Sequence, residues 1–168
     1  IAAVAFESPY SMIVTDAHRL ILRVNQAFTR TTGYSAEEVI GKPPGILTSA
    51  LHSADLFRAI WQAVDSGGGW QGEVFDRRKD GEVYPTWLTL SPVTDESGGV
   101  SHYVVTYHDI TERKKADQRI AELAFFDVLT GVPNRALLLE HLQRAMTANG
   151  RNNTTSAVLF IDLDRFKM

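Results

Sequence analysis

The stretch Trp70-Gln-Gly-Glu-Val-Phe-Asp-Arg77, followed by Asp80-Gly81 and then by Val83-Tyr-Pro-Thr-Trp-Leu-Thr-Leu-Ser-Pro-Val-Thr94, decides the fold. From Gln71 to Arg77 and again from Val83 to Thr94, residues alternate with a period of two, which is typical of two strands joined by a tight turn. A third alternating run, Val100 to His108, follows the turn at residues 95–99. These runs predict an antiparallel meander, with Pro85 at an edge or in a bulge because it lacks a ladder N–H.

Two further strands are predicted before this meander, at Ser11 to Val14 and at Leu20 to Val24, because short aliphatic and β-branched runs flank a polar connection of hairpin length. With the meander they make a five-stranded antiparallel sheet. The predicted helices lie between the second and third strands, so the expected class is α+β.

Helix signals fill the segment between the second and third strands. Asn25 is placed to cap a helix over Gln26 to Thr32. Ser35 and Glu38 have the spacing of a capping box, which predicts a second short helix. Apolar residues between Leu56 and Val64 recur at helical spacing and predict a third helix with one buried face.

Composition excludes several classes of function. The chain has 168 residues, 17 Lys and Arg against 20 Asp and Glu, a net charge of −3, and no cysteine. The acidic balance argues against nucleic acid and anionic membranes as partners. The missing thiols exclude disulfides and any cofactor attached to cysteine. No apolar run is long enough to span a bilayer and no leader opens the chain, so we expect a cytoplasmic protein without membrane contact in this segment.

The pattern changes after residue 111. A charged helical run follows, in which Ala116, Ile120 and Leu123 are spaced four and three apart, as in a short coiled coil or a solvated linker helix. A turn at residues 127–134 precedes a predicted helix at Arg135 to Ala148. Its expected buried face holds Leu138, Leu142 and Ala145. The continuously apolar run at residues 157–161 predicts a buried strand.

Two carboxylates, Asp162 and Asp164, follow that apolar run at a spacing of two, which turns both toward one side of an extended chain. Carboxylates at a strand end are ligands that Mg²⁺ prefers, often shared with substrate phosphates. Together, Asp127-x-Leu-Thr-Gly-Val-Pro-Asn-Arg135 and Phe160-Ile-Asp-Leu-Asp-Arg-Phe-Lys167 resemble the opening of a GGDEF domain, the diguanylate cyclase family that condenses two GTP molecules into cyclic di-GMP.

The GGDEF resemblance implies roles for four residues. Mg²⁺ is expected on Asp162 and on the backbone carbonyl of Leu163, and phosphate is expected at the backbone N–H groups of Arg165 and Phe166. The guanine-contacting Asn and the Gly-Gly-Asp/Glu-Glu-Phe hairpin of that family are not in the sequence. We therefore expect the chain to be a piece of a longer protein and to be catalytically inactive by itself.

Residues 1–109 resemble a PAS domain. The matching segments are Asn25-Gln-Ala-Phe28, Thr32-Gly-Tyr34, Gly69-Trp-Gln-Gly-Glu73, Arg78-Lys-Asp-Gly81 and the exit motif Asp109-Ile-Thr111. The expected domains are a PAS sensor at 1–109, a signalling or coiled-coil helix at 110–126, and an incomplete GGDEF domain at 127–168. In PAS proteins the exit motif joins the last strand to an output helix, and here we expect Asp109 to pair with Arg113 and Thr111 to cap the helix.

The PAS resemblance also implies a pocket between the sheet and the small helices. Trp61, Trp70, Phe75 and Trp87 are the candidates for lining it, or they are core residues. The sequence leaves the ligand open, with a noncovalent flavin and a haem as candidates. Haem would require a histidine ligand, and His52, His102 and His108 are the candidates, each also readable as an ordinary surface or strand residue.

This arrangement predicts the sensory part of a bacterial signalling protein that controls cyclic di-GMP synthesis, acting as a homodimer because two GTP-loaded domains must face each other. Two alternatives remain open. In one, the GGDEF domain is a noncatalytic regulator of a downstream cyclic di-GMP phosphodiesterase. In the other, the PAS domain only dimerises or docks a partner and holds no small ligand.

Overall fold

The computed structural model describes residue 6, residues 8–152 and residues 154–161. The chain divides into two compact units, Ile1–Lys114 and Lys115–Met168. No helix in the described part of the chain combines the length and the apolar character that crossing a bilayer requires.

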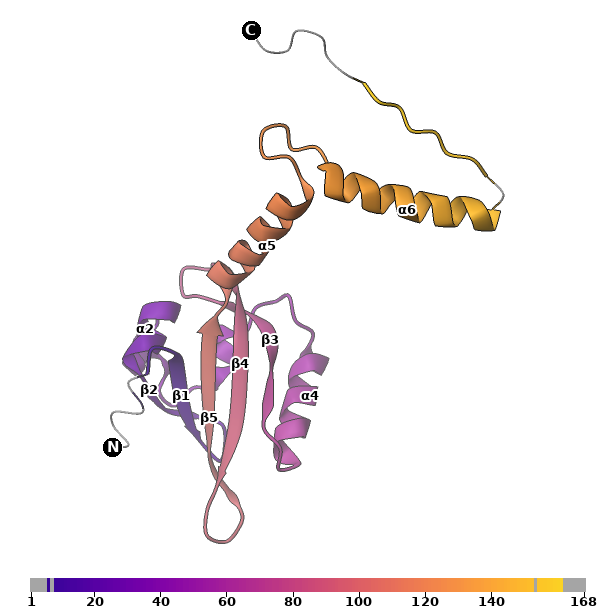
Figure 1. The fold of residues 1–168 in the computed structure, drawn as a ribbon. Helices are drawn as coiled ribbons and strands as arrows, with labels where there is room; N and C mark the ends of the chain where they lie inside the picture. Colours follow the sequence, from indigo (N-terminus) through magenta and orange to yellow (C-terminus); the bar gives the residue numbers. More distant parts are fainter. Residues whose placement is uncertain (1–5, 7, 153, 162–168) are drawn as a thin grey trace. The chain divides into compact units, whose positions relative to one another are not determined.

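The first unit is built on a five-stranded antiparallel sheet in the order β2-β1-β5-β4-β3. The strands are β1 (Ser11–Asp16), β2 (Ile21–Val24), β3 (Trp70–Arg77), β4 (Val83–Thr94) and β5 (Val100–Asp109). Figure 1 shows the three long strands β3, β4 and β5 side by side, with β1 next to β5 and β2 beyond β1. The predicted sheet is confirmed, with β1 two residues longer than expected.

Two short helices follow β2, and side chains define their starts. Helix α2 (Gln26–Thr32) begins at Asn25, whose side chain accepts a hydrogen bond from the Phe28 N–H, and ends at Gly33 with φ 77°. Helix α3 (Ala36–Val39) begins with the predicted capping box, in which Ser35 and Glu38 each accept a bond from the other's backbone N–H. These caps fix where the helices begin, because each satisfies backbone groups that a helix end leaves open.

The segment that follows covers one face of the sheet. The segment Pro43-Pro44-Gly45 leads into a 3-10 turn, η1 (Pro44–Leu47), and the next helix is the predicted third one, α4 (Ala54–Asp65). Residues from the sheet and from this cover form one buried core. Its members are Ile13, Ile21, Phe28, Val39, Leu47, Ile60, Val64, Val74, Leu88, Leu90, Tyr103, Val105 and Tyr107.

The pleat of the strands separates an inner, helix-covered face from an outer face. In β4, Tyr84, Thr86, Leu88 and Leu90 are buried, whereas the alternate residue Trp87 is 40% exposed. Adjacent side chains of a strand point to opposite faces, so the same alternation continues on β3 and β5. The inner face therefore carries the core and any site enclosed by the helices.

Both edges of the sheet have backbone contacts beyond the ladder. At the β3 edge, the Phe75 N–H donates to Nε2 of His52 at 2.6 Å, and Asp76 forms an isolated bridge with Thr48. At the β2 edge, Ile21 donates to the Lys42 carbonyl at 3.0 Å and accepts from the Gly41 N–H at 2.8 Å. Each edge strand is thus partly closed by the segment between β2 and β3.

Pro85 was predicted at a sheet edge or in a bulge, but it lies in β4, which has β5 on one side and β3 on the other. Its position still fits its missing N–H, because the β4–β5 register begins one residue later, at the pair Thr86 and Asp109. The Pro85 carbonyl accepts a bond from the Ile110 N–H at 3.0 Å. The proline therefore occupies the end of the ladder rather than its middle.

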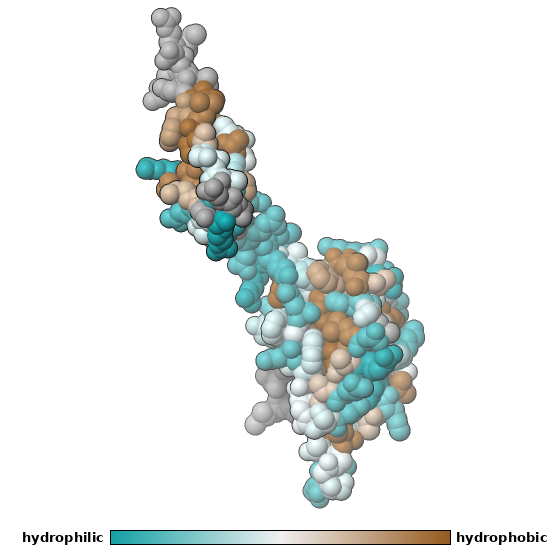
Figure 2. All heavy atoms as spheres, turned by 90° about the vertical axis from the view of Figure 1, so that its right-hand side faces the viewer, coloured by the Kyte–Doolittle hydropathy of each residue, from teal (hydrophilic) through white to brown (hydrophobic). Residues whose placement is uncertain are grey.

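The second unit contains the C-terminal part of helix α5 (Thr111–Phe125) and helix α6 (Arg135–Asn152). Asn134 caps α6, since its Oδ1 accepts from the Ala136 N–H at 2.9 Å. The expected buried face of α6 is wrong for this structure, because Leu138 is 43% exposed and Leu142 and Ala145 are only partly covered. Figure 2 shows apolar surface, in brown, on this unit as well as on the first.

The strand expected at residues 157–161 is also wrong for this structure. Residues 154–161 have no regular secondary structure, and all of them are exposed. A strand needs neighbours for its backbone groups, and no strand in the described part of the second unit lies beside it.

Candidate functional site

A cavity of about 420 Å³ lies between the inner sheet face and the segment η1–α4. Its volume is in the range of small-molecule sites. Strands β4 and β5 supply Leu88, Leu90 and Val105, and α4 supplies Phe57, Ile60 and Trp61. The lining is mainly apolar, with few polar groups, among them Arg19, Thr48, Asp76 and Tyr107.

Asp76 is the carboxylate of this cavity. It is 4% exposed and lies on the inner face of β3, opposite Tyr84 of β4. Burial raises the pKa of Asp76 to about 7, against the lowering influence of the nearby Thr86 hydroxyl. Its Oδ2 atom is buried without a hydrogen-bond partner among the described residues, as are the hydroxyls of Tyr84 and Thr86. Of these three residues only Asp76 lines the cavity, so its carboxyl is the buried polar group that a molecule in the cavity could reach.

Arg19 forms the rim of the cavity and is fixed there by contacts on two sides. Its guanidinium pairs with Asp65 at 2.7 Å and lies 4.1 Å from the centre of the Trp61 ring. Trp61 in turn makes an edge-to-face contact with Tyr103 at 5.3 Å. Arg19 also has φ 67°, a left-handed conformation that is uncommon for residues other than glycine. The ion pair with Asp65 balances the charge of Arg19.

The structure does not bring together the four aromatic residues named as pocket candidates. Trp61 lines the cavity, whereas Trp70 packs against the core at the start of β3, outside the cavity lining. Phe75 and Trp87 are 38% and 40% exposed, on the outer face of the sheet. The reason is the two-residue alternation, which turns Asp76 and Leu88 inward and their neighbours outward.

The three histidines considered as haem ligands lie outside the cavity lining. His52 is bonded to the edge of β3 through Nε2. His102 contacts Ser101 at 3.0 Å, and His108 makes an edge-to-face contact with Tyr10 at 4.8 Å. None of these positions offers a ring nitrogen to a ligand in the cavity.

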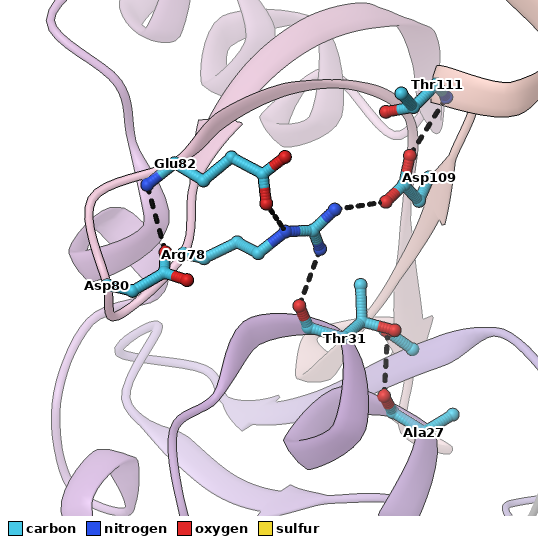
Figure 3. A network of polar contacts seen from close by, with 8 residues as sticks. Ala27, Thr31, Arg78, Asp80, Glu82, Asp109 and Thr111 are labelled. Atoms are coloured by element: carbon cyan, nitrogen blue, oxygen red, sulfur yellow. Dashed lines mark hydrogen bonds and ion pairs between the residues drawn. The ribbon is translucent and has the colours of Figure 1, made fainter.

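A polar junction connects the sheet to α5, and Arg78 is its centre (Figure 3). Its guanidinium donates to Oδ2 of Asp109 at 2.5 Å, to the Thr31 carbonyl at 2.6 Å and to Glu82 at 2.7 Å. It also lies 3.8 Å from the centre of the Tyr84 ring. Arg78 therefore links the β3–β4 turn, helix α2 and the end of β5.

Asp109 carries this junction into α5. Its Oδ1 accepts from the Thr111 N–H at 2.9 Å, so the capping carboxylate at the helix start belongs to Asp109. Burial acts to raise the pKa of Asp109, but the bonds from Thr111 and Arg78 outweigh it and hold the pKa below its ordinary value. Lys114 adds an ion pair with Glu73 of β3. The pairing of Asp109 with Arg113 stays a prediction.

In the second unit, the Asp127 to Asn134 turn is closed by side-chain bonds. Asp127 Oδ1 accepts from the Thr130 N–H at 2.9 Å and from its hydroxyl at 2.7 Å, and bonds with Thr130 lower the pKa of Asp127. Asn134 Nδ2 donates to the Ala124 carbonyl at 2.9 Å. The turn thus fixes the connection between the C-terminal end of α5 and the start of α6.

The predicted metal and phosphate residues lie outside the described residues; they are Asp162, Leu163, Arg165 and Phe166. Within the described ranges, no group of three or more His, Cys, Asp or Glu side chains is arranged to hold a metal ion.

Comparisons with known proteins agree with this architecture. Residues 9–112 match the PAS domain family model, and residues 124–168 match the model described as diguanylate cyclase, GGDEF domain. The chain is 26% identical over 145 residues to the nitrogen fixation regulatory protein of Klebsiella oxytoca, covering 85% of this chain and 29% of that protein. It is 26% identical over 162 residues to the probable diguanylate cyclase DgcE of Escherichia coli K12, covering 94% of this chain and 14% of that protein.

Among solved structures, an RNA-binding light-oxygen-voltage receptor superposes with a TM-score of 0.65 at 30% identity, covering 73% of this chain and 36% of that one. The chain thus spans less than a third of the first curated relative and a smaller share of the cyclase. The match to the PAS model includes the whole sheet, the cavity and the Asp109 junction. The chain therefore belongs to the PAS domain family, with a PAS domain at residues 9–112 followed by the start of a diguanylate cyclase GGDEF domain at residues 124–168.

Proposed function

We propose that the PAS domain is the sensory input of a longer signalling protein that makes cyclic di-GMP from two GTP molecules. The observation that carries the proposal is the Arg78 junction, which ties the sheet that forms the cavity to the first turn of α5. A cavity and an output helix joined by one guanidinium are the parts that a ligand-controlled switch needs.

Four contacts lead from the cavity to the helix. Asp76 lines the cavity and lies opposite Tyr84, and the guanidinium of Arg78 covers the Tyr84 ring at 3.8 Å. Arg78 then binds Asp109, which caps α5 through the Thr111 N–H. A ligand changes the balance between two arrangements of this junction only if it binds them with different affinity. We infer that filling the cavity supplies that difference.

On the output side, α5 is proposed to pair with its copy in a homodimer. Ile120 and Leu123 are 65% and 52% exposed, and no residue of α5 is buried. Two exposed apolar residues three apart fit a short helix–helix seam. Such a pair would bring two GGDEF domains together, each holding one GTP with Mg²⁺ on Asp162 and the Leu163 carbonyl, and with phosphate at the N–H groups of Arg165 and Phe166.

For the cavity ligand, flavin is the better of the two candidates. The walls offer Phe57 and Trp61 for a flat ring, and the likeness to a light-oxygen-voltage receptor supports the same class. A thiol adduct is excluded because the sequence has no cysteine. Haem has no histidine to bind among the residues that line the cavity.

The test is GTP turnover by a chain that continues through a full GGDEF domain, measured as cyclic di-GMP with Mg²⁺. We expect product that disappears in Asp162→Ala and a rate that changes when residues 1–109 are removed. Asp109→Ala should alter the rate, whereas Asp55→Ala, which removes an exposed ion pair of α4, should leave it unchanged.

Two results would contradict the proposal. Equal rates with and without residues 1–109 would remove the sensory role. A folded protein that binds GTP and yields no product would remove the cyclase role and favour the regulator of a phosphodiesterase.

A further inference from the structure

Arg19 stands at a backbone position that usually holds glycine. In the turn between β1 and β2, the Asp16 N–H donates to the Leu20 carbonyl and the Arg19 N–H donates to the Asp16 carbonyl, both at 3.0 Å. Hairpin loops closed in this way, here residues 17–19, end in a left-handed residue that is most often glycine. Arg19 has φ 67°, and in the part of the chain that the structure describes no other residue apart from the glycines has a positive φ. Such strain points to a role for the side chain.

The Arg19 side chain reaches from this turn to the end of α4. Its Nη2 donates to both carboxylate oxygens of Asp65, at 2.8 and 2.7 Å. The guanidinium lies 4.1 Å from the centre of the Trp61 ring, and Arg19 and Trp61 both line the cavity. From β5, the Tyr103 hydroxyl donates to Asp65 at 3.4 Å, and the Tyr103 ring meets Trp61 edge to face. Arg19 therefore joins the β1–β2 turn to the last turn of α4 at the rim of the cavity.

Stability of the fold does not account for this contact. The side chains of Arg19 and Asp65 are 36% and 48% exposed, and water and salt screen ion pairs of this kind, so that they add little to stability. The left-handed backbone of Arg19 works against even that small gain. Glycine or asparagine would form the same turn with less strain. The arginine is therefore better explained by what its side chain does at the cavity.

The two ends of α4 are held in different ways. Before its start, Nε2 of His52 accepts from the Phe75 N–H at 2.6 Å, which is a bond to the sheet itself. After its end come the glycines at 67–69, and a side chain placed at Gly67 would meet no atom within 4 Å. Glycine gives the backbone more freedom than other residues, so the end of α4 depends more on the ion pair with Arg19 than the start does. A pair that water and salt weaken opens and closes without disturbing the core.

We propose that Arg19 is a gate of the cavity. While the ion pair with Asp65 is formed, the guanidinium covers Trp61 and closes the rim. When the pair breaks, the guanidinium moves off the ring and the last turn of α4 is released, so that a ligand enters or leaves. The inference rests on the proposed function, because it takes the cavity as the sensory site. The gate sets how fast the sensor responds, whereas the walls of the cavity set its affinity.

The test measures the rates of ligand entry and exit. Lumiflavin is the probe, because it is flat, fluorescent and uncharged, so that its rates do not depend on attraction to the Arg19 charge. Stopped-flow fluorescence on the 168-residue chain gives kon and koff. Arg19→Asn removes the guanidinium and keeps a residue that adopts the left-handed conformation. Because a gate favours neither the free nor the bound state, both rate constants should rise about three- to tenfold, and Kd should stay within about twofold.

Salt and two further variants separate a gate from a binding contact. Salt screens the half-exposed pair, so the wild-type rate constants should rise between about 0.02 M and about 0.5 M NaCl, while those of Arg19→Asn stay constant. Asp65→Asn keeps the contact between the guanidinium and Trp61, so its rate constants should rise less than those of Arg19→Asn. Arg58→Met breaks an exposed ion pair of the same helix outside the cavity lining and should leave both rate constants unchanged. All variants should melt within about 5 °C of the wild type.

Three results would overturn the gate. If Arg19→Asn raises koff and Kd and leaves kon unchanged, Arg19 is a binding contact. If neither rate constant changes in Arg19→Asn, Arg19 only braces the turn. If lumiflavin binds neither the wild type nor any variant, the cavity does not admit the probe and the gate has nothing to control. None of these results decides the sensory role, which is judged by cyclic di-GMP production with and without residues 1–109.

Discussion

Replacing Arg78 by Met should destabilise the PAS domain far more than removing any exposed arginine. The Arg78 side chain is 18% exposed and that of Asp109 is 28% exposed, so the pair is shielded from water more than a surface ion pair. The change removes the bonds to Asp109 at 2.5 Å and to the Thr31 carbonyl at 2.6 Å, and the contact with the Tyr84 ring. It also removes the bond to Glu82, whose 58% exposed side chain makes that pair a weak one. Met keeps much of the aliphatic packing, so the loss is mainly polar.

The magnitude follows from these contacts. A hydrogen bond to a charged group contributes about 1.5–3 kcal/mol and a ring contact with a cation about 0.5–2 kcal/mol. Asp109 keeps the Thr111 N–H, so the sum is reduced and we expect a loss of about 3 kcal/mol in the free energy of unfolding. For a domain of this size that corresponds to a Tm lower by roughly 12–24 °C.

The assay is urea unfolding of the 168-residue chain followed by tryptophan emission. All three tryptophans, Trp61, Trp70 and Trp87, lie in the first unit, so the signal reports on the PAS domain alone. The control is Arg58→Met, which breaks the ion pair with Asp55, whose side chains are 67% and 80% exposed. This change should lower the free energy of unfolding by less than about 1 kcal/mol. A loss for Arg78→Met no larger than that of the control would refute the junction as a stabilising link.

Three further predictions concern the cavity and the caps. Because the pKa of Asp76 is raised from 3.8 to about 7, the folded state holds this proton while the unfolded state releases it, and stability falls as pH rises from about 4 to about 7. Urea unfolding at pH 5 and at pH 8 measures this fall: the free energy of unfolding of the wild type should drop by a few kcal/mol at most, relative to that of Asp76→Asn. Identical pH profiles of the wild type and the variant would contradict the prediction. Asn25→Ala should lower the free energy of unfolding by about 2–4 kcal/mol, because this residue is 1% exposed and its side chain bonds four backbone groups, those of Phe6, Tyr10, Met12 and Phe28. A change in stability within the error of the melting curve would be inconsistent with that network. Trp61→Ala should weaken the binding of lumiflavin, the ring system of a flavin, because Trp61 lines the cavity, whereas Trp87→Ala should leave the affinity unchanged because Trp87 is on the outer face. Equal losses of affinity for both variants in a fluorescence titration would place the ligand outside the cavity.

The sequence was sufficient for the elements whose signals are local. The β3–β4–β5 meander depends on alternation and on turns such as Asp80-Gly81, and α2 and α3 depend on caps at Asn25 and Ser35, all of which a few neighbouring residues determine. The run at 157–161 is different, since an apolar segment becomes a strand only when other strands pair with it. The apolar pattern of residues 157–161 does not say whether partner strands lie beside them.

The candidate site was predicted less completely than the fold. Four aromatic residues are pocket candidates in the sequence, yet the alternation of the strands puts Phe75 and Trp87 on the outer face. The same alternation contains the signal that was missed, because Asp76 follows the inward Val74 by two residues and so places a carboxylate inside. Arg78 was recognised only as part of a motif. Its pairing with Asp109, 31 residues away, depends on how β4 and β5 bring the two ends together.

The partly closed edges of the sheet affect how the protein behaves at high local concentration. Open strand edges offer backbone donors and acceptors to other chains, which is a common start of edge-to-edge polymerisation. Here the His52 ring and the Thr48 bridge occupy one edge, and Gly41 and Lys42 occupy the other. A second sheet that paired along either edge would first have to displace these contacts, so each of them opposes polymerisation at its edge.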